Sequence, residues 1–418
     1  MTTHLPMHLF YLDPDSTDNL QQQIRRQIAT AIMNGSIHPN DPLPSSRKLS
    51  GQLDVSRNTV ILAYEHLLDD GFIEARERSG YYVNPNMLRW RISSEDGDEE
   101  EQQSSIDWVD VLKASATGLR SIQKPSSWQR YEYPFTYGQF DPANFPTLHW
   151  RECSRDSVAG SAVKIWANDS LSDDPMLLEQ IQTHVLPRRG VWCNRDQILI
   201  TLGAQQGIYL LLKLLVGTEG VLGIENPGYT DVRNIAQLNG HRYKLLAVDD
   251  QGLVIDDDLG ACNCVFATPS HQFPTTVTMS LTRRKQLVKL ASDRQFFVIE
   301  DDYECESNFK ANPTPALKSM DRSGRVVYVG SFSKTLAPGL RIGFIVAPQP
   351  LIQEAHAIRR LMLRNVPQNN QRALALFISR GHYNTLVKKQ NRIFEERWRA
   401  MGEAVSYTHL TLPTKRIV

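Results

Sequence analysis

The stretch Ser331-Phe332-Ser333-Lys334-Thr335-Leu336-Ala337-Pro338-Gly339-Leu340-Arg341-Ile342-Gly343 decides the fold of the larger part of this chain. It joins two apolar runs, 325–330 and 344–347, which the pattern predicts to be buried strands. A lysine between two core strands, flanked by small hydroxyl residues, is poorly placed for a solvated charge. A Schiff base between the Lys334 amine and pyridoxal phosphate would neutralise the lysine and place it at the cofactor's reactive carbon. The alternative is a surface turn that carries an incidental lysine.

Polar residues on both sides of Lys334 suit the phosphate group of the same cofactor. Ser331 and Ser333 offer hydroxyl groups, and Arg341 offers a guanidinium fork that matches a phosphate dianion. The stretch also resembles the SxSK…G-x-R-x-G motif of the fold-type I aminotransferases. This resemblance implies an α/β domain that holds pyridoxal phosphate on Lys334.

Length and composition set the outer bounds. A chain of 418 residues is expected to hold two or more domains, and its formal net charge of zero favours neither nucleic acid nor membrane. No apolar run approaches the roughly 20 residues that a membrane-spanning helix needs. Scattered cysteines without a CxxC pair suit a reducing cytoplasm. The five cysteines are Cys153, Cys193, Cys262, Cys264 and Cys305.

Residues 10–85 have the pattern of a winged helix-turn-helix, an α+β module. Apolar residues at helical spacing predict a first helix over 20–32, and Pro-Ser-Ser at 44–46 predicts the entry and cap of a second. Ser56 is predicted to cap a third helix that ends at Asp70-Gly71. Two short strands, 72–75 and 81–83, would form the wing.

The third helix opens with polar residues where a helix-turn-helix meets base edges and phosphates. Arg57 has the geometry to reach a guanine. The module is not net basic, and the alternative is a small helical module that binds another protein. Residues 43–83 resemble the GntR-type winged helix, which implies binding to double-stranded operator DNA. The DNA contacts are expected at Arg47, Ser56, Arg57, Asn58, Thr59 and Gly80.

Residues 86–130 are predicted to be a linker. The run 93–103 is acidic and polar, cannot bury a core and favours an extended, mobile tether. A short helix is expected over 107–119.

Strands and helices alternate over 131–405, which predicts an α/β domain with a largely parallel sheet. A strand at 197–201 is followed by Gly203-Ala204-Gln205 and a helix, an arrangement that cradles phosphate with backbone N–H groups. The aminotransferase resemblance makes Ala204 and Gln205 cofactor-binding candidates. Tyr229 follows the next strand and Pro227-Gly228, and the family's P-x-Y motif implies that its ring stacks on the pyridine; the alternative is an ordinary packed tyrosine.

The strand 295–303 ends in three acids, Glu300, Asp301 and Asp302, which need a cation if they are buried together. The protonated pyridine nitrogen would provide one. By the family resemblance, Asp301 takes that role and Tyr303 hydrogen-bonds the phenolic oxygen. The alternative is a site of the Mg²⁺ type. Because the lysine motif already accounts for the charges, no metal site is predicted.

Residues 268–276 resemble the TPSHQxPTG element of the MocR regulators, in which a GntR-type winged helix is fused to an aminotransferase-like domain. Two departures stand out. Thr276 replaces the usual glycine of a turn that needs positive φ. Phe273 stands where aminotransferases carry an asparagine against the phenolic oxygen, and His271 or Gln272 are the residues that would substitute.

Residues 406–418 show no useful helical or strand period and no match to the family. The family normally continues into a small domain that supplies an arginine for the ligand's carboxylate. We therefore expect 406–418 to be a foreign tail and the protein to be a truncated version of a longer one.

The sequence as a whole resembles a cytoplasmic, homodimeric MocR-type regulator. It would sense an amine, an amino acid or pyridoxal phosphate itself through an aldimine at Lys334. One rival is a working aminotransferase with a DNA-binding appendage. Another is a GntR-type repressor whose second domain only dimerises, although a scaffold needs no Schiff-base lysine.

Overall fold

The computed structural model describes residues 11–86, 107–112, 114–122, 125–134, 136, 138, 140–167, 171–304, 306 and 314–411, without the side chains of 129, 161, 165, 166 and 406–411. The chain divides into two compact units, Met1–Val111 and Leu112–Val418. The predicted acidic run 93–103 lies outside the described residues.

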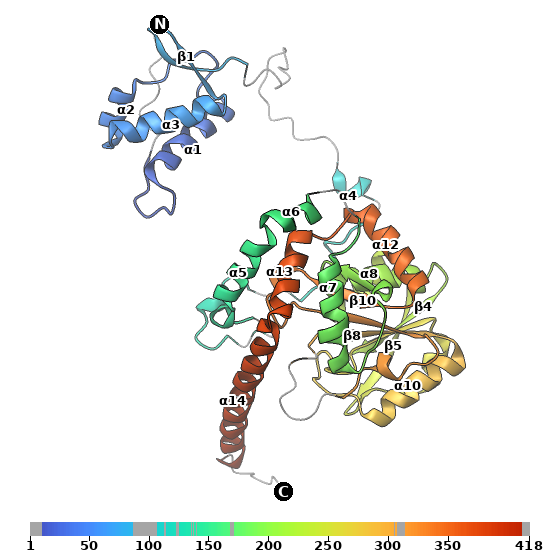
Figure 1. Ribbon diagram of the computed structural model, residues 1–418. Coiled ribbons are helices and arrows are strands. Elements are labelled where there is room, and N and C mark those ends of the chain that lie inside the picture. Colours follow the sequence, from blue (N-terminus) through green and yellow to red (C-terminus); the bar gives the residue numbers. More distant parts are fainter. Residues whose placement is uncertain are drawn as a thin grey trace. The chain divides into compact units, whose positions relative to one another are not determined.

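The first unit packs three helices against a two-stranded hairpin (Figure 1). Its elements are α1 (Leu20–Met33), α2 (Ser46–Leu53), α3 (Arg57–Asp69), β1 (Ile73–Arg76) and β2 (Gly80–Val83), followed by the short α4 (Trp108–Val111). The helix starts follow from local side-chain caps. Asn19 and Gln22 form a capping box on α1, while the Ser45 and Ser56 hydroxyls accept the amides of Lys48 and Thr59. The predicted caps at Pro-Ser-Ser and at Ser56 are therefore confirmed.

A single apolar core holds this unit together. Ile24, Ile28 and Ile32 of α1 pack with Val60 and Tyr64 of α3, and all five side chains are at most 1% exposed. The Tyr64 hydroxyl donates to the Pro44 carbonyl at 2.8 Å, which ties α3 to the turn before α2. The wing pairs in register from Ile73 with Val83 to Arg76 with Gly80. The winged helix-turn-helix predicted from the sequence is thus the observed fold.

The predicted helix over 107–119 is wrong in its extent. The described residues of this segment are helical only in α4, Trp108–Val111. The four side chains of α4 are all exposed, so no packing extends this short helix along the chain.

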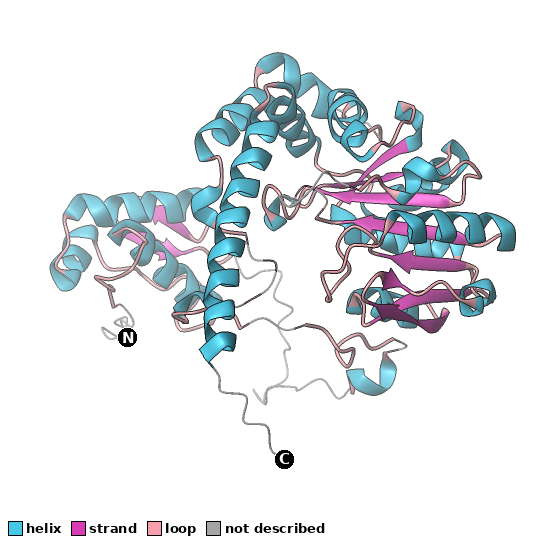
Figure 2. Ribbon diagram, turned by 90° about the horizontal axis from the view of Figure 1, so that it is seen from below, coloured by secondary structure: helices cyan, strands magenta, loops and turns pink. Residues whose placement is uncertain are grey.

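The second unit is built on an eight-stranded sheet with helices on both faces (Figure 2). The strand order is β3-β10-β9-β8-β7-β4-β5-β6, and the pairs from β5 through β4, β7 and β8 to β9 are parallel. β10 runs antiparallel to both of its neighbours. The strands are β3 (Ile198–Thr201), β4 (Val221–Asn226), β5 (Arg242–Asp249), β6 (Gly252–Leu253), β7 (Cys264–Ala267), β8 (Phe297–Asp302), β9 (Val326–Ser331) and β10 (Gly343–Val346).

The helices of this unit cover the sheet and extend into α14, which projects from the body (Figure 1). They are α5 (Thr147–Ser157), α6 (Gly160–Trp166), α7 (Pro175–Gln180), α8 (Gly203–Leu215), α9 (Thr230–Leu238), α10 (Leu281–Arg294), α11 (Leu317–Met320), α12 (Gln349–Leu363), α13 (Gln368–Ser379) and α14 (His382–Thr411). Residues 406–411, read from the sequence as having no helical period, continue α14. Residues 412–418 lie outside the described part of the chain.

The topology brings many strand ends to one edge of the sheet. Because β4, β7, β8 and β9 are parallel and β3 shares their direction through the antiparallel β10, all five carboxyl ends meet there. Gly343, the first residue of β10, pairs with both Thr201 and Ser331 at this edge. Ligands of open α/β sheets bind at such edges.

Thr276 has φ +65°, so the turn that the sequence pattern marked for glycine does require the left-handed region. In this region the backbone of a β-branched residue is strained by roughly 1–2 kcal/mol. Replacing it with glycine removes the strain, but it also costs about 0.5–1 kcal/mol because an unfolded glycine has more conformational freedom to lose. We expect Thr276→Gly to stabilise the fold by about 0.5–1 kcal/mol in urea denaturation. Thr278→Gly, at a position without positive φ, should destabilise it. A loss of stability in Thr276→Gly would contradict the strain.

Candidate cofactor and DNA sites

Lys334 lies just past the carboxyl end of β9, in the connection to β10. Its side chain is half-buried, and its Nζ donates to the Gly138 carbonyl at 3.3 Å. Gly138 has φ +61°, and a Cβ there would stand 2.1 Å from the lysine nitrogen. Ser333 and Lys334 line a cavity together with Asn144 and Glu304. The amine therefore faces a space that a ligand can enter.

Two of the segments predicted to bind phosphate meet at the same sheet edge as this lysine. Arg341 donates to the Leu202 carbonyl at 3.1 Å, immediately before α8. Gly203 opens α8 with φ +74°, and a Cβ there would stand 3.3 Å from the Arg341 guanidinium. Gly343 lies against the backbone of Gly203 and Ala204. The result is a helix N-terminus with an arginine beside it, which is a favourable setting for a phosphate dianion.

We call the N-terminus of α8, Arg341 and the two serines Ser331 and Ser333 the phosphate cup. The Ser333 amide donates to the Ser331 hydroxyl at 3.2 Å, which turns the chain sharply at the end of β9. Ser331 pairs with Gly343, the glycine that touches the start of α8. The strand pairing thus places both serines near Ala204, although these segments are far apart in the sequence.

The three acids at the end of β8 do not share one cation, which corrects the sequence interpretation. Side chains alternate along a strand, so Glu300 and Asp302 point to one face and Asp301 to the other. Asp302 accepts from Arg189 Nε at 2.7 Å and from the Tyr328 hydroxyl at 2.8 Å.

Glu300 accepts the backbone amides of Leu317 and Lys318, and the Arg284 guanidinium lies 3.9 Å away. The Mg²⁺ alternative for the triplet also fails, because its carboxylates diverge and two of them are already paired.

Asp301 is the unsatisfied member of the triplet. Its side chain is buried, and its Oδ1 has no hydrogen-bond partner among the described residues. Burial, followed by the charges of Asp302, Glu225 and Glu300, raises its pKa to about 8. A buried carboxylate without a partner is costly, so this side chain needs a proton or a cationic ligand.

Tyr229 and Gln205 are joined through one aspartate. The Tyr229 hydroxyl and the Gln205 side-chain amide both lie within hydrogen-bond distance of Asp231 Oδ2, at 3.1 and 3.3 Å. The Tyr229 ring meets the edge of Phe273, with the ring centres 6.0 Å apart and an interplanar angle of 85°. These contacts hold the aromatic ring at the sheet edge between β4 and β7.

The residues considered as substitutes for the missing asparagine differ in their environment. The Gln272 amide nitrogen donates to Glu225 and to the Pro227 and Phe273 carbonyls, so its donors are used inside the loop. His271 packs edge-on against the Tyr303 ring at 6.1 Å and stands 3.9 Å from Glu304. Of the two, His271 is the one beside Tyr303.

Sequence reasoning missed three contributors to this site. Glu225 is buried against Thr268 and Gln272, and burial raises its pKa to about 7. Arg189, which neutralises Asp302, comes from a segment before the sheet. Gly138, the partner of Lys334, also precedes the sheet. Of the three, only Glu225 could have been predicted from the sequence, as a glutamate at the end of a buried strand. The roles of Arg189 and Gly138 depend on the fold.

The predicted DNA-contacting residues lie at the starts of α2 and α3 and in the wing. Ser56 and Thr59 bond to each other at 2.8 Å and cap the helix. Arg57 is exposed and donates to the Ser46 hydroxyl at 3.3 Å, and Asn58 is also exposed.

Two further residues of this predicted set are exposed in the same unit. Arg47 lies in the first turn of α2, and Gly80 begins β2 with φ +110°. The structure thus leaves Arg57, Asn58 and Arg47 with accessible polar groups.

The two units match two families of known proteins. Residues 20–83 match the model of bacterial regulatory proteins of the gntR family, and residues 170–405 match that of aminotransferases of class I and II. The chain therefore combines a DNA-binding domain of the GntR type with an aminotransferase domain. Because a relative of the same organisation is 38% identical over most of both chains, this protein belongs to the MocR-type transcription regulators.

Individual relatives share this organisation along nearly the whole chain. The HTH-type transcriptional regulator TauR of Rhodobacter capsulatus is 38% identical over 96% of this chain and 82% of its own length. The probable rhizopine catabolism regulatory protein MocR of Rhizobium meliloti is 29% identical over 93% and 78%.

Among solved structures, the kynurenine aminotransferase of Pyrococcus horikoshii, determined with PMP, matches with a TM-score of 0.59. The match has 27% identity and covers 64% of this chain and 69% of the enzyme. In the described part of the chain, no helix is long and apolar enough to cross a membrane.

Proposed function

We propose that this protein is a cytoplasmic transcription regulator that binds pyridoxal phosphate on Lys334 and senses a small amine or amino acid there. The observation that carries the proposal is Asp301. Its partnerless carboxylate oxygen is buried at the same sheet edge as Lys334 and the phosphate cup. The pyridinium nitrogen of the cofactor is the cation that such a carboxylate requires.

The remaining residues fit the same cofactor. Arg341, Ser331, Ser333 and the amides at the start of α8 would hold its phosphate, and Tyr229 would lie against its ring. Bound there, pyridoxal phosphate supplies an aldehyde carbon that bonds reversibly to primary amines. Lys334 would hold the cofactor, and the cavity that it lines with Asn144 and Glu304 would admit the effector amine.

The effector can regulate only through a difference in its affinity for two states of the protein. We propose that the regulator acts as a homodimer, so that two winged helices meet two DNA half-sites. The test begins with selection of DNA fragments that the purified full-length protein binds. The operator affinity is then measured with and without candidate amines, and the protein-to-DNA stoichiometry is recorded.

A dimer on each operator and an affinity that changes with an amine in the wild type, but not in Lys334→Ala, would support the proposal. The same response in Lys334→Ala would contradict it.

Recognition of the operator is expected to depend on the exposed polar start of α3. Arg57→Ala and Asn58→Ala should each weaken binding by about tenfold or more, which corresponds to about 1–3 kcal/mol per lost base contact. Thermal unfolding should barely change, because both side chains are exposed. Fluorescence anisotropy with labelled operator measures the effect.

The control for the charge is Arg26→Ala, which removes a positive charge from the exposed face of α1. It should keep the specificity for the operator. Equal losses in Arg26→Ala and Arg57→Ala would show that only non-specific attraction had been measured.

A second candidate function is transamination, because Lys334, Asp301, Tyr303 and Arg341 are all present at the sheet edge. One observation works against it: Phe273 packs on Tyr229 and has no group that could hydrogen-bond the cofactor's phenolic oxygen. Conversion of a keto acid in repeated turnovers would favour the enzyme over the sensor.

A further inference from the structure

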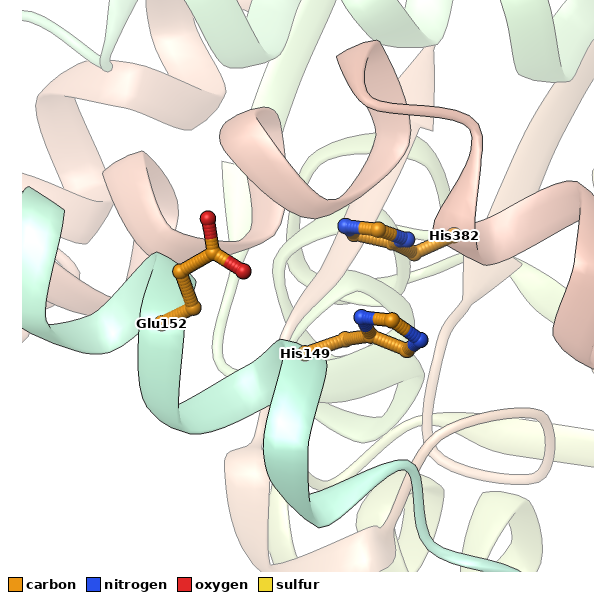
Figure 3. A group of neighbouring side chains, drawn as sticks. All are labelled: His149, Glu152 and His382. Atoms are coloured by element: carbon orange, nitrogen blue, oxygen red, sulfur yellow. The ribbon is translucent and has the colours of Figure 1, made fainter.

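Three side chains that bind metals well lie together in the second unit, apart from the candidate cofactor site. They are His149 and Glu152 of α5 and His382, the first residue of α14 (Figure 3). One ligand atom from each residue lies within 4.8 Å of the other two. The i, i+3 spacing places His149 and Glu152 on the same face of α5, and the packing of α13 and α14 supplies His382.

The two imidazole rings are held in a defined arrangement. They stack with their centres 4.0 Å apart and an interplanar angle of 17°. The Phe377 ring supports His382 from α13, at 5.5 Å between ring centres. In Figure 3 the Glu152 carboxylate lies beside both rings, on a side where each ring carries a nitrogen. Small rotations of the exposed side chains would bring two nitrogens and one oxygen toward a common point.

We propose that His149, Glu152 and His382 bind one divalent transition-metal ion of the Zn²⁺ class. Two imidazole nitrogens and a carboxylate oxygen are ligands that Zn²⁺ accepts at about 2.0–2.2 Å, and a tetrahedral ion would keep a fourth position for water. Imidazole favours Zn²⁺ and its transition-metal neighbours over Mg²⁺ and Ca²⁺, which prefer oxygen ligands.

Arg380 is the group that competes with the ion. Its guanidinium lies 3.3 Å from Glu152 Oε1 and 2.7 Å from Asp156 Oδ2. Because the contact with Asp156 is the closer one, Arg380 can stay on Asp156 when Glu152 turns to the metal. The ion pair with Glu152 therefore lowers the metal affinity without blocking the site, and its removal should raise the affinity.

A metal ion here would link α5, which precedes the sheet, to the start of the long α14. Such a link stabilises the folded unit by an amount that grows with the logarithm of the free ion concentration, since the unfolded chain does not hold the three ligands together. The sequence contains the His-x-x-Glu pair on α5, but the third ligand is recognisable only from the fold.

The test is calorimetric titration of the full-length protein, without a polyhistidine tag, with Zn²⁺. Co²⁺ serves as a second probe, because its visible absorption reports the coordination geometry. We expect one ion per chain. His149→Ala and His382→Ala should each weaken binding by more than about tenfold, since even loss of an outer-shell partner costs 10–100-fold. Arg380→Gln should tighten binding, and the control His184→Ala, an exposed histidine outside the cluster, should leave it unchanged.

Wild-type protein that binds neither ion, or His149→Ala that binds Zn²⁺ as tightly as the wild type, would overturn the proposal. His149 is exposed, so its variant is expected to fold, and a far-ultraviolet circular dichroism spectrum checks this. The decision therefore does not depend on the more buried His382.

Discussion

Lys334→Ala is expected to lose pyridoxal phosphate almost completely on dialysis, while the wild type keeps it. The variant removes the amine that bonds to the cofactor's aldehyde, and only the phosphate cup, Asp301 and the aromatic contact remain. We expect the Kd to rise by about a hundredfold, which corresponds to about 2.8 kcal/mol. The visible absorption of the lysine-bound cofactor should disappear as well. Release of the cofactor by alkali and its quantification measure the loss directly.

This variant should still fold, although Lys334 is half-buried and its Nζ bonds to the carbonyl of a loop residue, Gly138. Loss of one such hydrogen bond costs about 0.5–1.5 kcal/mol of stability, and thermal unfolding of the variant checks this. Lys389→Ala, an exposed lysine on α14, is the matched control and should retain the cofactor. If Lys334→Ala retained the cofactor as tightly as Lys389→Ala does, the assignment of the lysine would be wrong.

Asp301→Asn is expected to weaken cofactor binding and to reduce the pH dependence of the stability of the cofactor-free protein. The amide keeps the shape of the side chain but carries no negative charge to balance the pyridinium nitrogen. The affinity for pyridoxal phosphate should therefore fall by about tenfold or more, as expected when a hydrogen bond to a charged group, of about 1.5–3 kcal/mol, loses its charge. Equilibrium titration of the cofactor-free protein with pyridoxal phosphate measures this change.

The pH dependence of stability supplies the second readout for Asp301→Asn. In the cofactor-free fold, burial and the neighbouring acids raise the pKa of Asp301 from its ordinary value of 3.8 to about 8. Between these two values the folded state binds more protons than the unfolded state, so stability falls as the pH rises. The slope from this one group is at most about 1.4 kcal/mol per pH unit.

Asp301→Asn should remove the contribution of Asp301 to the change in the free energy of unfolding with pH. Asp250→Asn, in an exposed turn, should leave this pH dependence unchanged. Urea denaturation of the cofactor-free proteins between about pH 5 and 8 makes the comparison, within the window set by the two pKa values. Identical slopes in the wild type and Asp301→Asn would mean that Asp301 is not held as an unpaired buried acid.

Much of the fold could be predicted because its determinants are local. The caps Ser45 and Ser56, the β-branched strands and the glycine-type turn at Thr276 each act within a few residues, so the sequence pattern carries them. The sequence analysis failed to predict that residues 406–411 are helical, because the apolar residues there do not recur at helical spacing. One signal was present: residues 402–412 contain no proline that would break a helix, and Pro413 comes two residues after Thr411, where the helix ends.

The candidate site was predictable in its motif residues and unpredictable in its partners. Lys334, Arg341 and Ala204 belong to recognisable local patterns, and the sheet topology brings them to one edge. Asp301 points away from Glu300 and Asp302 because successive side chains of a strand face opposite sides of the sheet, and this could have been predicted from the sequence. The guanidinium groups of Arg189 and Arg284 could not, because long-range packing brings them to Asp302 and Glu300.

The measurement that tests the central proposal most directly is the visible absorption spectrum of the purified protein during titration with primary amines and amino acids. The proposal predicts an absorption band from cofactor bound to Lys334, which shifts when the effector amine is added and then stays constant. A spectrum without any such band, or one that no amine changes, would contradict the sensor. Decay of the band to the pyridoxamine form, with recovery on addition of a keto acid, would show an aminotransferase instead.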